Sequence, residues 1–326
     1  MKYKILVLFV FALLCFSQTI AQKRKNVLLV TNSGRQVSTK DSADFIRIIS
    51  EPDSGSILYN VNEYYKNGKL KLIGKSWKFD HLQFEGSCIN FYPSGKRESI
   101  TTYSKGEIVG DIYSYYPNGM LYTILGPPDS THVTPNLENG LIIKLCNDSI
   151  GHHLAINGKG DFVSYSNDFK QVYEHGMING GLRDGEWEGR TFETDSLTYT
   201  ETYDKGKFIS GESRDKSGNT YTYTSREVEP SPLNGIEKFY IDLGNKLHYP
   251  EESKESQTQG RVILRFIIEK DGSLTNFEIL HTPDKYLGEE ALRCVKLSPK
   301  WLPGTQYGKP VRIQFSIPVS FSLGDR

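Results

Sequence analysis

The stretch "GRVILRFIIEKDGSLTNFEIL", residues 260–280, has the pattern of two β-strands joined by a tight turn. In its first half an all-apolar row of residues alternates with a second row that includes Arg261 and Arg265, as in a strand with one buried face. The turn falls at Lys270-Asp271-Gly272, because glycine accepts the positive φ that a tight hairpin turn requires. We therefore expect a β-hairpin whose first strand contributes a buried row of side chains, namely Val262, Leu264, Phe266 and Ile268.

Segments with helical spacing lie on both sides of this hairpin. Before it, "GIEKFYIDLGNKL", residues 235–247, predicts a helix with Phe239, Ile241 and Leu243 on or near its buried side. Pro250 follows, where the chain is forced into extended backbone and a brief new turn of helix can start. After the hairpin, "LGEEALRCVKL" predicts a second helix with one apolar stripe, made of Leu287, Ala291, Cys294 and Val295.

Two further features define this second helix. Glu289 and Glu290 are expected in an exposed first turn, where acidic side chains favour a helix N-terminus. Pro299 is expected to stop the helix. Trp301 then provides a large apolar side chain beneath the sheet, and Pro310 precedes a last strand.

That last strand is "VRIQFSI", residues 311–317. Its apolar residues Val311, Ile313, Phe315 and Ile317 alternate with Arg312, Gln314 and Ser316. The alternation predicts a strand with one face on the core, which completes a sheet with the hairpin at 260–280. A strand at the end of a sheet has one edge without a neighbour, and this edge is a place where a partner could pair.

In this order, "YPEES", "GRVILRFIIEKDGSL", "EEALRCVKLSPKWLPG" and "GKPVRIQFSIPVSF" closely resemble the TonB C-terminal domain. The resemblance covers about residues 235 to 324. It implies a small α+β domain whose final strand accepts an extended peptide, the TonB box of an outer-membrane transporter. This mode of binding is β-augmentation, in which backbone hydrogen bonds supply the affinity and alternate side chains the selectivity.

The resemblance also implies which residues meet the partner. Arg312, Gln314 and Ser316 alternate along the final strand. Lys246, Leu247 and His248 are carried over by position only, because the segment before Tyr249-Pro250 lies at the partner contact in the family. The implied partner is an outer-membrane TonB-dependent transporter or another envelope protein.

The chain departs from an energy-transducing TonB in two respects. In the family, such a protein has an uncleaved membrane anchor that contains a histidine, and a long Pro-rich stalk follows the anchor. Here no histidine precedes His81, and the 14 prolines are scattered. We therefore expect binding to an envelope protein without coupling to the proton gradient.

The middle of the chain contains internal repeats. "YYKNGK" at 64–69, "FYPSGK" at 91–96 and "YYPNGM" at 115–120 are copies of one motif, and their glycines are 27 and 24 residues apart. After a gap, Gly158, Gly180 and Gly206 resume at 22 and 26 residues. Each unit predicts a β-hairpin, because the glycine allows positive φ at a tight turn between aromatic strands.

These units loosely resemble the MORN-type repeat, and "GGLRDGEWEGR" at 180–190 is the nearest copy. The resemblance implies a scaffold or a binding surface and no reaction. The aromatic residues are expected to pack across strands first. The alternative is a ligand groove lined by exposed Tyr65, Tyr92 and Tyr116.

The front of the chain reads as a signal peptide. Lys2 and Lys4 precede an apolar core from Ile5 to Phe16, and Thr19-Ile20-Ala21 is a small-x-small cleavage site. We expect a mature chain that begins at Gln22 in the periplasm. An uncleaved inner-membrane anchor, which would revive an energy transducer, is the alternative.

Composition excludes several classes of function. Lysine plus arginine equals aspartate plus glutamate at 39 each, so the net charge suggests no nucleic-acid or anionic-membrane partner. No catalytic motif and no metal-ligand spacing occur, so we expect no enzyme activity, no metal and no cofactor. The mature chain keeps Cys88, Cys146 and Cys294, which are either all buried thiols or include a Cys88–Cys146 bridge.

The sequence thus predicts a mixed fold, a mainly-β array of MORN-like hairpins followed by a small α+β TonB C-terminal-like domain. The function expected is a transport-associated adapter of the periplasm. The alternative is an envelope scaffold whose C-terminal domain binds another protein or itself. The expected parts are a signal peptide at 1–21, lead-in strands at 22–57, hairpin repeats at 58–225, a linker at 226–234 and the C-terminal domain at 235–326.

Overall fold

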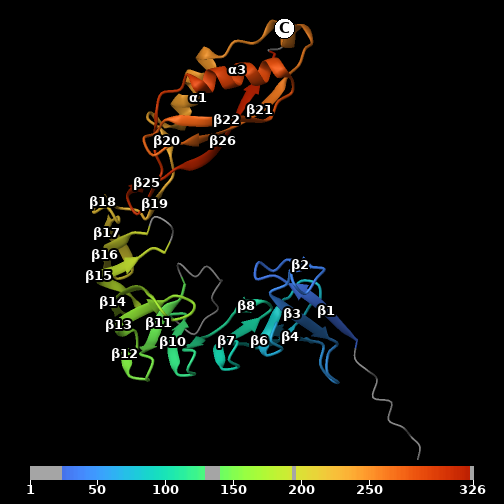
Figure 1. The fold of residues 1–326 in the computed structure, drawn as a ribbon, viewed down its shortest axis with the longest axis vertical. Coiled ribbons are helices and arrows are strands. Elements are labelled where there is room, and N and C mark those ends of the chain that lie inside the picture. The colour runs from blue at the N-terminus through green and yellow to red at the C-terminus, as the bar shows by residue number, and fades with distance from the viewer. Residues whose placement is uncertain (1–23, 129–139, 193–195, 324–326) are drawn as a thin grey trace, which may run out of the picture. The chain divides into compact units, whose positions relative to one another are not determined.

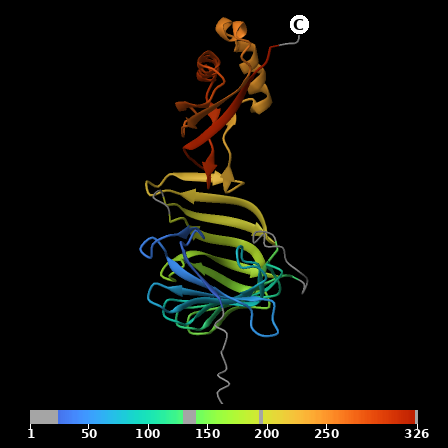
Figure 2. The same cartoon turned by 90° about the vertical axis from the view of Figure 1, so that its right-hand side faces the viewer.

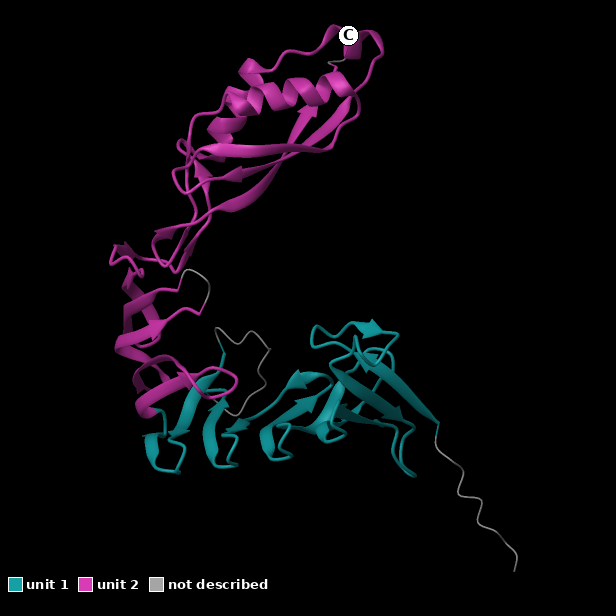
Figure 3. Cartoon of the chain, viewed as in Figure 1, with its two compact units in different colours: residues 1–158 teal, residues 159–326 magenta. Residues whose placement is uncertain are grey.

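The computed structural model describes residues 24–128, 140–192 and 196–323. The chain forms two compact units, residues 1–158 and 159–326 (Figure 3). The predicted signal peptide at 1–21 lies outside the described residues. None of the helices in the described part of the chain is long and apolar enough to span a membrane.

The first unit is built from short antiparallel strands (Figure 1). Each strand from β3 to β7 pairs with the strand that follows it in the sequence. The strands β9, β10, β11 and β12 also pair in sequence order. In addition, β7 pairs with β9. The expected lead-in strands are β1 and β3, which pair with one another. The strands are β1 (Lys25–Val30), β2 (Gln36–Val37), β3 (Phe45–Ser50), β4 (Tyr59–Tyr65), β5 (Leu70–Ser76), β6 (Phe84–Phe91), β7 (Arg97–Ser104), β8 (Glu107–Ile108), β9 (Ile112–Tyr115), β10 (Leu121–Gly126), β11 (Ile142–Asn147) and β12 (His153–Ile156).

The turns between these strands repeat one geometry. The N–H of Gly68 donates to the carbonyl of Tyr65 at 2.8 Å, and two later turns make the same bond at 2.7 Å. The expected turn glycines all have positive φ, namely Gly68, Gly95, Gly119, Gly158, Gly180 and Gly206. The glycine-based hairpin turns are therefore present, and their kinship to MORN repeats stays a prediction.

Tyrosines join each hairpin of the first unit to the next. The hydroxyl of Tyr65 donates to the carbonyl of Phe91 at 2.7 Å, and the hydroxyl of Tyr92 donates to Tyr115 at 2.6 Å. Tyr116 is 4% exposed and donates to Asn147 at 2.8 Å. The alternative of an exposed tyrosine groove is therefore wrong, because these hydroxyls are bonded to backbone of the following repeat.

The second unit begins with further antiparallel strands, which Figure 2 shows side by side in green to yellow. Glycines lie opposite large aromatic rings here, and a Cβ on Gly211 would come within 2.2 Å of the Tyr223 ring. In the same way, the absence of a side chain at Gly189 leaves space for the ring of Tyr199, and Gly176 leaves space for the ring of Trp187. The strands are β13 (Lys159–Tyr165), β14 (Val172–Asn179), β15 (Leu182–Arg190), β16 (Thr198–Asp204), β17 (Lys207–Arg214) and β18 (Thr220–Tyr223).

The rest of the second unit is an α+β module. Its main sheet has three antiparallel strands in the order β22-β21-β26, and α3 packs against β21 and β22. Short strands precede the first helix and follow the last. The elements are β19 (Glu227–Val228), β20 (Ser231–Pro232), α1 (Gly235–Lys246), α2 (Glu251–Glu255), β21 (Gly260–Ile268), β22 (Leu274–His281), α3 (Lys285–Lys296), β23 (Trp301–Leu302), β24 (Thr305–Gln306), β25 (Lys309–Pro310) and β26 (Ile313–Phe321).

The core of this module is the predicted one. All four alternating residues of β21 and all four residues of the α3 stripe are at most 1% exposed. Trp301 is buried against the rings of Phe239, Phe266 and Phe315. Ile241 was expected on the buried side and is 57% exposed instead. It is two positions, or about 200°, from both Phe239 and Leu243 on the helix, so it faces away when they face in.

Two other expectations meet the structure here. The predicted linker, 226–234, contains β19 and β20, which pair with β24 and β23 of the module. Cys88, Cys146 and Cys294 are all buried free thiols, as in the first of the two alternatives for the cysteines.

Candidate partner-binding site

One long edge of the three-stranded sheet is formed by β26. This strand pairs with β21 along its whole length, from Ile313 opposite Ile268 to Phe321 opposite Gly260, without a register shift. Within residues 24–128, 140–192 and 196–323, no strand pairs with the other side of β26. The final strand therefore has a free edge, as the sequence led us to expect.

Pro318 determines which backbone groups point to that edge. It lies opposite Ile263 in the regular ladder, and proline has no N–H to donate. A proline is accommodated in a strand where its nitrogen faces away from the neighbouring strand. Because residues alternate in direction along an antiparallel strand, the N–H and C=O groups of Gln314 and Ser316 then also face the free edge.

The side chains of β26 alternate as predicted. Gln314 and Ser316 are exposed, while Ile313 and Phe315 are partly buried. The strand starts at Ile313, two residues later than its alternation suggested. Arg312 precedes the strand and donates from Nε to both carboxylate oxygens of Glu269, at 2.9 and 3.0 Å.

The other expected contact residues, Lys246, Leu247 and His248, lie at the end of α1. The carbonyl of Lys246 accepts a hydrogen bond from Nη2 of Arg293 at 2.9 Å, and Leu247 packs against the core. The N–H of His248 donates to Oε1 of Glu290 at 2.8 Å, while its side chain is 83% exposed. The segment is thus fixed by α3 and presents His248 to solvent.

Glu290 was expected to be exposed, and this was wrong. Its side chain is 13% exposed and accepts two hydrogen bonds from Arg293, each 2.7 Å long. These bonds, which outweigh the effect of burial, lower the pKa of Glu290 to about 2. The sequence placed Glu289 and Glu290 correctly on α3 but not in its first turn, because the helix begins at Lys285 and its first turn contains no acidic residue. The sequence also did not show that residues 246–248 contact that side of the helix.

The structure therefore places the predicted contact residues in two groups. Arg312, Gln314 and Ser316 follow the β26 edge, and residues 246–248 lie against α3. In the described part of the chain no hydrogen bond or ion pair links the groups. Their contact with a partner stays a prediction. The role of Pro318 in orienting the edge was not expected from the sequence. The available signal was its position two and four residues after Ser316 and Gln314, which puts all three on the same edge of a strand.

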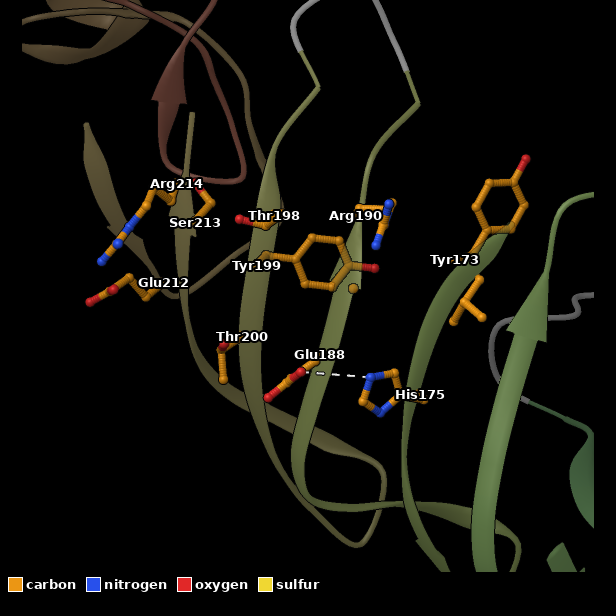
Figure 4. Close-up of a pocket in the computed structure, with 12 residues that line it drawn as sticks. Tyr173, His175, Glu188, Arg190, Thr198, Tyr199, Thr200, Glu212, Ser213 and Arg214 are labelled. Carbon is orange, nitrogen blue, oxygen red and sulfur yellow. Dashed lines mark ion pairs between the residues drawn. The ribbon is translucent and has the colours of Figure 1, made fainter. Parts of the chain in front are cut away.

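A second feature is a hollow of about 610 Å³ on the sheet β14–β17 (Figure 4). Two rows of side chains cross it. In one row Glu188, Thr200 and Glu212 lie on successive strands, and in the other Arg190, Thr198 and Arg214 do so. His175 pairs with Glu188 at 3.6 Å (Figure 4). The hollow is open and its lining is charged with both signs.

Comparison with solved structures finds similar chains. Among them are two NMR solution structures of the TonB C-terminal domain from Helicobacter pylori. The longer has 23% sequence identity and covers 28% of this chain and 81% of that chain, with a TM-score of 0.23. The shorter has 26% identity and covers 26% of this chain and 90% of that chain, with a TM-score of 0.21.

No curated protein matches the chain. A family match exists for about a quarter of its length. Residues 245–323 match the family described as Gram-negative bacterial TonB protein C-terminal. This range contains α3, β26 and residues 246–248.

Proposed function

We propose that this protein is a non-catalytic adapter of the periplasm that binds an outer-membrane TonB-dependent transporter, or another envelope protein, by β-strand addition to β26. The observation that carries the proposal is the free edge of β26, with the amides of Gln314 and Ser316 directed to it. The TonB C-terminal family match of residues 245–323 supports the same reading.

The edge favours a modest and reversible interaction. Gln314 and Ser316 can each donate and accept, whereas Pro318 can only accept. Each backbone hydrogen bond contributes about 0.5–1.5 kcal/mol net, so a few of them give a grip that a partner can release. Arg312 at the start of the edge is held by Glu269, which leaves the strand's polar side chains to provide selectivity.

A scaffold role is the second candidate, and the hollow on β14–β17 favours it. The hollow offers carboxylates, guanidinium groups and hydroxyls on rigid strands, which suits polar recognition. In that case the C-terminal module holds one envelope protein or a second copy while the repeats bind another ligand.

The test is capture from an envelope extract of a Gram-negative host with residues 22–326 as bait. Recovery of a TonB-dependent transporter by the parent protein, and its loss with Gln314→Pro, is the expected result. If the parent recovers neither an outer-membrane transporter nor another envelope protein, or Gln314→Pro recovers the same partner equally well, adapter function through the β26 edge is refuted.

A further inference from the structure

The segment between Trp301 and β26 forms an arm with a hairpin at its tip. Strands β24 and β25 pair with each other, and β24 also pairs with β19. Tyr307 and Gly308 form the turn, with φ of 49° and 76°. A tyrosine in this left-handed region is uncommon, and contacts made by its side chain must offset the cost of that backbone conformation.

The ring of Tyr307 packs on the strands of the repeat sheet. It stacks on Tyr199 of β16 with ring centroids 4.9 Å apart, and meets Tyr223 of β18 edge-on at 5.8 Å. Arg226 lies over the same ring with its Cζ 5.5 Å from the centroid. Aromatic pairs and cation–π contacts of this kind stabilise a packed interface.

A buried charge cluster lies beside this ring. Glu201 is fully buried and accepts hydrogen bonds from Arg226 at 2.5 and 2.8 Å. The hydroxyls of Tyr203 and Tyr223 also donate to Glu201, at 2.8 and 2.9 Å. A buried carboxylate needs such complete pairing, so the cluster holds Arg226, and the chain on either side of it, in one place.

Backbone and side-chain bonds complete the attachment. The N–H of Tyr307 donates to the carbonyl of Arg226 at 2.6 Å, and Ser213 Oγ donates to the carbonyl of Tyr307 at 2.7 Å. Lys309 and Asp215 form a largely buried ion pair at 3.6 Å. We call these contacts the joint, defined by Tyr199, Glu201, Ser213, Asp215, Tyr223, Arg226, Tyr307 and Lys309.

We propose that the end of the sheet β16–β18 is a docking surface for the Tyr307-Gly308 hairpin tip. These three strands, and not a flexible linker, then fix the position of the β26 edge relative to themselves. Tyr307 is six residues before Ile313, the first residue of β26. A partner paired with β26 is thereby held against a folded support. The functional meaning of the joint rests on the proposed strand addition, whereas its existence does not.

The test is hydrogen exchange followed by mass spectrometry on residues 22–326. In the parent protein, peptides that cover 226–230 and 303–310 exchange slowly. Tyr307→Ala removes the ring that docks and accelerates their exchange by at least about tenfold, because the arm then opens without unfolding the core. Tyr286→Ala, which removes an exposed tyrosine of α3, is the matched control and leaves these peptides unchanged.

Ser213→Ala is the second variant, and it tests the docking of the hairpin tip if Tyr307→Ala does not fold. It removes one bond from the repeat side and accelerates exchange in 303–310 by about two- to tenfold. Fast exchange of these peptides in the parent protein, or unchanged exchange in the variants that fold, overturns the docking. Binding of an extended transporter-derived peptide is measured on the same samples, so failure of strand addition is seen separately.

Discussion

Pro318 of β26 lies opposite Ile263 of β21 in a ladder without a register shift. Because proline has no N–H, this pairing directs the even-numbered residues of β26 to the free edge. The position of Pro318 therefore indicates which residues of β26 present their backbone groups to the free edge. It also marks where the row of free N–H donors is interrupted, since no donor is available at position 318.

Replacement of Pro318 by alanine tests this direction. Alanine adds an N–H at the free edge, so an extended peptide that reaches this position binds about two- to tenfold more tightly, the value of one hydrogen bond. Isothermal titration calorimetry with a transporter-derived peptide measures the change. A gain in the free energy of unfolding without a gain in affinity would mean that the proline faces β21 instead.

Proline substitutions at neighbouring positions separate binding from folding. Gln314→Pro removes a donor from the free edge, so the module stays folded and peptide affinity falls. Ile313→Pro removes a donor from the ladder with β21 and destabilises the module by about 1–3 kcal/mol, because the acceptor on β21 is left without its partner. Thermal unfolding and peptide binding are measured for both, with Ile313→Ala as the control for the lost side chain. Equal effects of the two prolines on folding would refute the assignment of the edges.

The buried carboxylate of Glu201 predicts a dependence of stability on pH. Burial alone would raise its pKa, but the hydrogen bonds and charge of Arg226 outweigh this and lower the pKa below its ordinary value. A lowered pKa contributes stability above the ordinary pKa of glutamate, about 4.3, and this is lost as pH falls through the folded-state pKa. The free energy of unfolding of the parent protein therefore drops below about pH 4–5.

Glu201→Gln removes this titration. The variant is about 3–5 kcal/mol less stable at pH 7, because Arg226 loses its buried counter-charge, and its stability depends less on pH in the acid range. Urea unfolding between pH 7 and pH 3 measures both effects, with the exposed Glu186→Gln as control. Parallel pH profiles for parent and Glu201→Gln would contradict the ion pair.

The tyrosine bonds between hairpins predict small, separate losses. Tyr65→Phe and Tyr92→Phe each remove one hydroxyl donor to the next repeat and cost about 0.5–1.5 kcal/mol. Tyr240→Phe, at an exposed tyrosine of α1, serves as the control. Chemical unfolding measures the three. Were Tyr65→Phe and Tyr92→Phe no more destabilising than Tyr240→Phe, the hydroxyl bonds would have no stabilising role.

The local pattern predicted the C-terminal module well. Alternation in β21 and the spacing of the α3 stripe correctly gave the buried rows, because both depend only on the period of the element. Alternation in β26 correctly gave the inward-facing side chains, of which Ile313 and Phe315 are partly buried. Ile241 was misplaced because three apolar residues at every second position do not fit one face of a helix. Glu290 was misplaced because its burial comes from residues 246–248, which are distant in sequence.

The joint could not be predicted from the sequence. Tyr307-Gly308 reads only as a turn, and nothing near it indicates Tyr199 or Ser213 as neighbours. In the repeats the glycines correctly marked the turns, since positive φ is a local requirement. The hydrogen bonds of Tyr65 and Tyr92 depend on which carbonyl of the next hairpin lies within reach of each hydroxyl, and this follows from the register of that hairpin.

Amide exchange at single residues of β26 tests the central claim most directly. NMR of residues 22–326, with and without a saturating extended transporter-derived peptide, compares Gln314 and Ser316 with Phe315 and Ile317. We predict that the amides of Gln314 and Ser316 exchange rapidly in the free protein and become protected with the peptide, while Phe315 and Ile317 are protected in both states. Unchanged exchange at Gln314 and Ser316 in the presence of bound peptide would contradict strand addition at β26.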